Sequence, residues 1–178
     1  MAGFAAFANA VGVVILVVLP LLCYVSGSVL FITAGYGAWQ SARPGSWWSE
    51  HKALPLLALL LGAMMLTFDR VLDKAQASFG GSVNFAMAPG LTAYSYTPPT
   101  QAGLLGSTPE QTVMNLVSTF IVFFIAFGAL MCFLALQRLW GLGKGTARGG
   151  YSHPVIQGLF GLALINIHSV TAYIMANF

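Results

Sequence analysis

Thirty-six consecutive residues, from Phe4 to Trp39, contain no charged side chain. At 1.5 Å per residue a helix of this length measures on the order of 50 Å, longer than the ~30 Å hydrocarbon core of a bilayer. Only 6% of the 178 residues are charged and 58% are hydrophobic, whereas average soluble domains carry roughly 25% charged residues. Charged side chains are too few to cover a soluble surface, so the sequence predicts an integral membrane protein.

Three further apolar runs follow, at residues 54–68, 113–136 and 154–178. Because a spanning helix needs about 20 mostly apolar residues, the chain has room for four spans and no separate soluble domain. We therefore predict an all-α integral membrane protein with about four membrane helices, arranged as two tandem helical hairpins joined by a polar loop. The predicted segments are a first hairpin with an apolar N-terminal segment (1–74), a Tyr/Pro/Gly-rich outward loop (75–112) and a second hairpin (113–178).

Proline marks two expected helix boundaries. Pro20 lies in the middle of the first apolar run, where it would kink a continuous helix. We expect residues 4–19 to form a surface-lying or packed segment that leads into a true span at about 20–39, with a single long tilted helix as the alternative. Further along, Thr108 is expected to cap a helix that begins at Pro109, with Gln111 closing a capping box.

Basic residues gather in the two short connections between the predicted spans. Residues 40–53 and 138–153 hold five of the seven Lys and Arg residues, whereas the stretch between them, residues 54–137, holds two, offset by three acidic residues. The positive-inside rule places both short connections in the cytoplasm, so both termini and the middle loop face outward. The candidate lipid-facing or lumen-facing residues of these basic loops are Arg43, Lys52, Lys144 and Arg148.

The two halves of the chain share a spacing of glycine, tryptophan and proline. A Gly–x(11)–Trp pattern, a short loop and a Pro–x(6)–Gly pattern occur in this order twice, which indicates a duplicated hairpin; chance agreement between two apolar sequences is the alternative. Glycines let membrane helices approach closely, so the four glycines are predicted packing positions. The two sets are Gly27, Trp39, Pro55 and Gly62, and Gly128, Trp140, Pro154 and Gly161.

Titratable side chains are too sparse to suggest an enzyme, and the sequence offers neither catalytic residues nor a metal site. Asp69 and His168 occupy equivalent places in the two halves, and we interpret them as a polar helix-end pair with a structural role. An ionisable group inside a span is otherwise a functional candidate. Cys23 and Cys132 lie within apolar runs, where they are expected to act as small apolar side chains rather than as a disulfide or as metal ligands.

Residues 150–171, Gly-Tyr-Ser-His-Pro-Val-Ile-Gln-Gly-Leu-Phe-Gly-Leu-Ala-Leu-Ile-Asn-Ile-His-Ser-Val-Thr, resemble the C-terminal segment of the IcmC/DotE–TraQ family. These are small inner-membrane proteins of type IVB secretion and IncI-type conjugation systems. The shared features are a Gly-rich polar loop after an aromatic or basic helix end, and then a Gly-x-x-Gly helix that ends in Ile-Asn-Ile. Size and order of spans agree over most of the chain, whereas residues 75–112 match nothing in the family. The family has no assigned catalytic residues to carry over.

The resemblance implies a structural, membrane-embedded subunit of a conjugative or type IVB (type IV secretion) DNA-transfer apparatus. We expect it in the bacterial inner membrane as a multi-pass protein with both termini periplasmic, assembling by helix packing into a homo-oligomer. In a sharper form it is a pilin-like pilus subunit, extracellular after assembly. Expected partners are copies of itself, other membrane components of the apparatus and anionic phospholipid, with nucleic acid only as passing cargo. The alternative is a small membrane transporter or channel with Asp69 and His168 on its pathway.

The charge asymmetry yields a topology prediction. A cysteine introduced at Ser46 or Ser152 lies in a predicted cytoplasmic connection, so a membrane-impermeant maleimide added from the periplasmic side is expected to leave it unlabelled until the membrane is permeabilised. Labelling is measured by the mass shift of the protein on a gel. Efficient labelling in intact spheroplasts would contradict the predicted orientation.

Overall fold

The computed structural model describes residues 2–78 and 108–177, and throughout these ranges the regular structure is helical with no strand. The predicted all-helical class is thereby confirmed for this part of the chain. The elements before the gap are α1 (Ala2–Ser41), α2 (Trp47–Glu50), α3 (Ala53–Leu66) and α4 (Phe68–Ser78). Those after it are α5 (Pro109–Thr119), α6 (Ile121–Gly143), α7 (Ser152–Ile165) and α8 (Ile167–Asn177).

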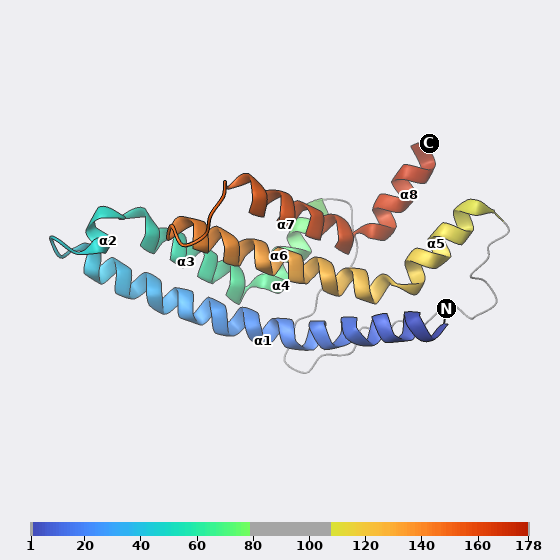
Figure 1. The fold of residues 1–178 in the computed structure, drawn as a ribbon, viewed down its shortest axis with the longest axis horizontal. Coiled ribbons are helices and arrows are strands. Elements are labelled where there is room, and N and C mark those ends of the chain that lie inside the picture. The colour runs from blue at the N-terminus through green and yellow to red at the C-terminus, as the bar shows by residue number, and fades with distance from the viewer. Residues whose placement is uncertain (1, 79–107, 178) are drawn as a thin grey trace.

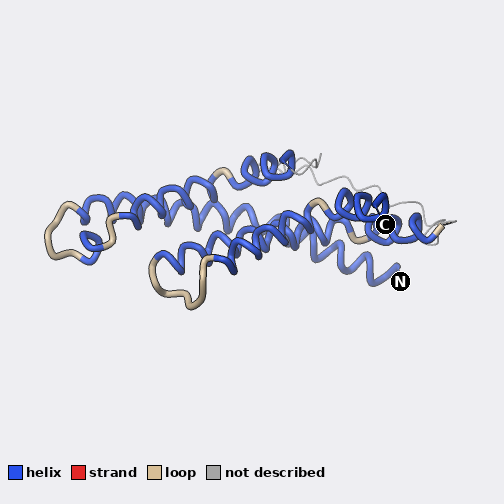
Figure 2. The backbone as a smooth tube through the Cα atoms, turned by 90° about the horizontal axis from the view of Figure 1, so that it is seen from above, coloured by secondary structure: helices blue, strands red, loops and turns tan. Residues whose placement is uncertain are grey.

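The helices form an elongated bundle of two antiparallel pairs (Figure 1). α3 runs back along α1, and α7 runs back along α6, while α6 also packs against α1 and α3. α1 and α6 run in the same direction, so the α1–α3 and α6–α7 connections lie toward the same end of the molecule. Figure 2 shows that the second connection is set back along the long axis relative to the first. The two pairs are therefore parallel but staggered.

The first helix passes through Pro20 without a break. The expectation of a separate segment at residues 4–19 is therefore wrong, and the alternative of one long helix holds. A proline inside an apolar helix is tolerated where neighbouring helices re-satisfy the freed backbone groups, and Pro20 lies against the α3–α4 bend. One face of α1 is buried at intervals of three, four or seven residues: Ala5, Ala8, Gly12, Leu19, Cys23, Gly27, Leu30 and Ala34.

The second arm of each pair bends sharply, by 83° between α3 and α4 and by 82° between α7 and α8. At the first bend the Thr67 hydroxyl and backbone N–H both donate to the carbonyl of Ala63, at 2.8 and 3.0 Å. At the second bend the Asn166 side-chain amide and backbone N–H both donate to the carbonyl of Leu162, at 3.3 and 3.1 Å. Side-chain bonds to the carbonyl four residues earlier compete with the regular ladder and bend helices.

Within residues 2–78 and 108–177, two helices are long and apolar enough to cross a membrane, Gly3–Ser41 and Ile121–Gly143. The number rises to four if each bent pair, α3 with α4 and α7 with α8, is one broken span. α3 has 14 residues, about 21 Å of helix, which is shorter than the ~30 Å hydrocarbon core. The apolar helices thus agree with a membrane protein, and the second and fourth apolar runs form bent helix pairs.

The predicted middle loop is shorter than residues 75–112, because α4 continues to Ser78 and α5 starts at Pro109. The predicted cap of α5 is confirmed: the Thr108 hydroxyl accepts from the backbone N–H of Gln111 at 3.3 Å, and Pro109 opens the helix. The remainder of the predicted loop, residues 79–107, lies outside the described residues.

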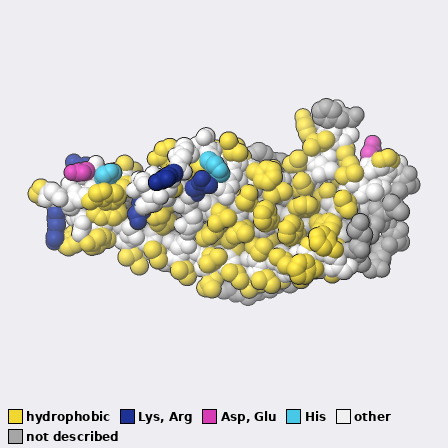
Figure 3. Space-filling model, viewed as in Figure 1, with side chains coloured by type: hydrophobic (Ala, Val, Ile, Leu, Met, Phe, Trp, Pro, Cys, Tyr) yellow, Lys and Arg dark blue, Asp and Glu magenta, His cyan; other side chains and the backbone are white. Residues whose placement is uncertain are grey.

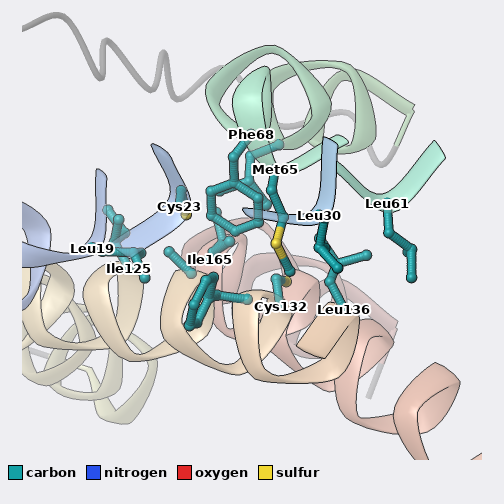
Figure 4. Close-up of a cluster of buried hydrophobic side chains, with 13 residues drawn as sticks. Leu19, Cys23, Leu30, Leu61, Met65, Phe68, Ile125, Cys132, Leu136 and Ile165 are labelled. Atoms are coloured by element: carbon teal, nitrogen blue, oxygen red, sulfur yellow. The ribbon is translucent and has the colours of Figure 1, made fainter. Parts of the chain in front are cut away.

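A single apolar core joins the two helix pairs (Figure 4). Leu19 and Cys23 of α1 face Ile125 of α6, while Met65 and Phe68 close the core from the α3–α4 side. The core is shared by both halves of the chain, so neither half packs independently of the other. Its remaining members are Leu30, Leu61, Leu72, Ala129, Cys132, Phe133, Leu136 and Ile165.

Candidate functional site

The four glycines singled out in the sequence meet in two pairs, each at a helix crossing. A Cβ atom added to Gly62 of α3 would lie 3.2 Å from the carbonyl oxygen of Gly27 of α1. A Cβ atom added to Gly161 of α7 would lie 2.7 Å from the carbonyl oxygen of Gly128 of α6. The second distance is shorter than Cβ contacts in real structures and the first is tighter than most of them, so each crossing is favoured by two residues that lack a side chain.

The two crossings also match in their surroundings. The added atom on Gly27 would meet Leu66, and that on Gly128 would meet Ile165. These positions are equivalent in the repeat. A residue of α1 (the long arm of the first pair) corresponds to the residue of α6 that lies 101 positions later, and a residue of α3 or α4 (the short arm) corresponds to the residue of α7 or α8 that lies 99 positions later. The same offset of 99 relates the ends of α3 to those of α7, and the ends of α4 to those of α8. The repeated spacing in the sequence therefore coincides with a repeated helix-pair geometry.

Each long helix also ends in an equivalent aromatic–cation pair. The guanidinium carbon of Arg43 lies 3.9 Å from the ring centroid of Trp39, and Nζ of Lys144 lies 5.5 Å from that of Trp140. Both cations are exposed. A cation over an indole ring is attracted by about 0.5–1 kcal/mol at such sites. The sequence identified the tryptophans and the basic loops but not this stacking between them.

The four basic loop residues are exposed and lie toward one end of the molecule. Lys52 precedes α3, and Arg148 lies in the α6–α7 connection with Lys144. Figure 3 shows Lys and Arg side chains gathered on the half of the molecule that carries the two connections, while hydrophobic side chains cover much of the remaining visible surface. This end can attract anionic groups, and the rest of the visible face offers apolar contact.

Asp69 and His168 are not brought together. Both lie in the first turn after a bend, Asp69 on α4 and His168 on α8. Asp69 is partly buried next to Pro20 and Tyr24 of α1, whereas His168 is exposed. Their positions match by the repeat but they form no joint site, so the structure offers no geometry for proton transfer between them.

The sequence analysis did not anticipate a groove at the bend between α7 and α8. It has a volume of about 500 Å³ and is lined mainly by apolar side chains, with Asn166 at its base. The Asn166 side chain is 4% exposed, and its Oδ1 has no partner among the described residues. The Asn166 side-chain amide donates instead to the Leu162 carbonyl of the preceding helix turn. The only sequence signal was an Asn within an apolar run.

Chemically reactive side chains do not cluster in the described residues. Cys23 and Cys132 are buried, unpaired and on different helices. In residues 2–78 and 108–177, no group of three or more His, Cys, Asp and Glu side chains lies close enough to hold a metal ion.

No family model, curated protein or solved structure matches the chain. The resemblance of residues 150–171 to the IcmC/DotE–TraQ family therefore stays a prediction. Three features of the described residues bear on function: two equivalent glycine crossings, two aromatic–cation helix ends and a largely apolar exposed surface.

The crossings generate a stability prediction. Replacing Gly161 with Leu, or Gly62 with Leu, forces a side chain into a backbone contact, and overpacking typically costs about 1–3 kcal/mol. We expect both variants to insert into the membrane but to unfold at lower temperature in detergent. Gly35→Leu is the matched control, because a Cβ atom at Gly35 of α1 meets nothing within 4 Å. An unchanged unfolding temperature for Gly161→Leu would contradict the role assigned to the crossing.

Proposed function

We propose that the protein is a structural, membrane-embedded subunit that assembles with copies of itself in a conjugative or type IVB DNA-transfer apparatus, in a pilin-like manner. The observation that carries the proposal is the repeated unit: two apolar helix pairs, each held by a glycine crossing and each turning through a short basic connection. In this proposal each pair is one hairpin, and the chain is a tandem of two hairpins.

The exposed surface of α1 supports assembly through helix packing. Large apolar side chains are exposed along almost its whole length, from Phe4 to Trp39, and none of the neighbouring positions is charged. In a membrane such a surface contacts lipid or other helices, because water is excluded. A helix of 40 residues measures about 60 Å and extends past the ~30 Å hydrocarbon core. Packing against other protein copies would cover the length that lipid tails do not.

The transfer apparatus itself enters through the sequence resemblance of residues 150–171 alone. That resemblance, together with the positive-inside rule, supports the bacterial inner membrane, with both termini periplasmic and the two basic connections cytoplasmic. Other membrane components of the apparatus are the further partners that this proposal names.

The rival function, a small transporter or channel, requires Asp69 and His168 to lie on one pathway. They lie on separate helices, one beside α1 and the other exposed. The structural role is therefore the proposal that agrees better with the geometry.

The proposed function predicts a defined assembly that tolerates loss of both ionisable groups. Purified protein is expected to form filaments or regular multi-subunit particles in electron micrographs, and Asp69→Asn and His168→Ala are expected to leave them unchanged. Gly161→Leu is expected to abolish them, because the hairpin that presents the packing surface is distorted. Isolated monomeric particles of the unmodified protein would contradict the proposal. Loss of activity in Asp69→Asn or His168→Ala, with assembly unchanged, would favour the transporter.

The basic connections predict bound anionic lipid. Lys144 and Arg148 are exposed, and no acidic residue follows Glu110 in the chain. Each Lys or Arg near a membrane surface attracts anionic head groups by about 1 kcal/mol. Mass spectrometry of lipid extracted from the purified assembly is expected to show enrichment of phosphatidylglycerol or cardiolipin over the host membrane. The enrichment is expected to fall when Lys144 and Arg148 are both changed to Gln; equal lipid content in that variant would mean that these charges only set topology.

A further inference from the structure

The two halves of the chain bury opposite faces of the repeated hairpin. In the first half, α3 is covered on one side by α6: a Cβ atom added to Gly143 would touch Leu57, and Gln137 lies 3.8 Å from the sulfur of Met65. Leu61, on the same face of α3, is 2% exposed. The equivalent face of α7 carries Ile156 and Phe160, which are 64% and 54% exposed.

The opposite face shows the reverse pattern. On α6, Val122 and Phe133 are buried against the first half, with 4% and 7% exposed. Their equivalents on α1 are Leu21 and Ile32, which are 64% and 72% exposed. The contact between the halves therefore uses a face of α3 in the first half and a face of α6 in the second half. The equivalent faces, on α7 in the second half and on α1 in the first half, stay uncovered.

We propose that a second copy of the chain joins these two uncovered faces. The receiving face of α7, with Ile156 and Phe160, packs against the α1 face of the next copy, with Leu21, Val25 and Ile32. The occupant is a second copy because the contact between the halves already shows what fits: the same hairpin, presenting the equivalent face. This inference rests on the proposed self-assembly and specifies its surfaces.

The contact is of the head-to-tail kind, since the two faces differ. Such contacts close into rings only when the repeating operation is a pure rotation, and otherwise they produce open helical arrays. The side-chain amide of Asn9 donates to the Thr119 carbonyl at 2.9 Å, and a Cβ atom on Gly12 would lie 3.0 Å from the Val122 carbonyl. In each of these two contacts the residues are 110 positions apart in the chain, whereas equivalent positions of α1 and α6 are 101 apart.

The second half is thus displaced along α1 by nine residues relative to a purely rotated copy, or about 14 Å at 1.5 Å per residue. A displacement of this size at every step prevents ring closure. It also carries successive hairpins out of a hydrocarbon core only ~30 Å thick. The geometry between the halves therefore points to a helical filament that leaves the membrane plane as it grows.

Cysteine cross-linking tests the pairing of the two faces. The contact of Gly143 with Leu57 between the halves corresponds, between copies, to a contact of Ile156 in one copy with Ala42 in the next copy. Both residues are exposed, so cysteine at either position leaves the fold intact. Oxidation of the Ala42→Cys, Ile156→Cys double variant is expected to give a ladder of dimers, trimers and larger species on a non-reducing gel.

Matched variants distinguish this contact from others. Val155→Cys replaces Ile156→Cys in the control, because Val155 is 51% exposed but lies about 100° around the helix; it is expected to give no ladder. Each single variant alone is expected to give no dimer, whereas a co-assembled mixture of the two single variants gives dimers only. The native chain, with Cys23 and Cys132 buried, is the background control.

Three outcomes would overturn the inference. Cross-linking of a single variant to itself would show a two-fold contact instead of a head-to-tail one. Assemblies that keep their size in electron micrographs but give no ladder would show that copies meet elsewhere, with lipid on these faces, and would leave the proposed function standing. A chain that stays monomeric in detergent and in lipid nanodiscs would overturn both the inference and the proposed function.

Discussion

Close backbone contact between two helices, made where both lack a side chain, organises the described structure. Gly27 meets Gly62 and Gly128 meets Gly161, and each contact brings a carbonyl of one helix to within reach of the next helix's Cα. Apolar side chains cannot by themselves hold helices together in lipid, since lipid tails are equally apolar, so fit at close range becomes decisive. The bundle follows from this: two tight pairs, joined by a shared core of larger side chains between them.

Bends in the second arms coincide with a second local interaction. Thr67 and Asn166 each bond back to the carbonyl four residues earlier, and each helix turns by more than 80° at that residue. The chemistry differs between a hydroxyl and an amide, yet the positions and the turns are equivalent. What recurs is the geometry rather than the residue type, and this recurrence agrees with the duplication that the sequence spacing predicts. Among the described helices, α1 of the first pair has a continuous extension, the part before Leu19, against which α5 ends and α6 begins.

The unequal burial of equivalent residues connects the fold to assembly. Two identical hairpins in isolation would expose the same faces. Here each helix pair covers only one face of the other pair, and the second pair is displaced along α1. Two different surfaces, one on α1 and one on α7, therefore stay exposed. In the proposed assembly, each copy contains one complete contact of this kind and contributes half of two others. The basic ends, all toward one end of the molecule, would then repeat along an assembly and concentrate positive charge there.

Sequence alone determined that the described chain is helical and apolar enough for a membrane, where α5 begins, and which four glycines recur. These features are local: hydropathy, a capping residue and spacing along one helix decide them. Tertiary structure decided that α1 runs unbroken through Pro20, that α3 and α7 stop after 14 residues, and that Asp69 and His168 stay apart. It also decided the displacement between the halves. Each of these depends on which neighbours surround a residue, and spacing along the chain carries no information about how far one helix slides along another.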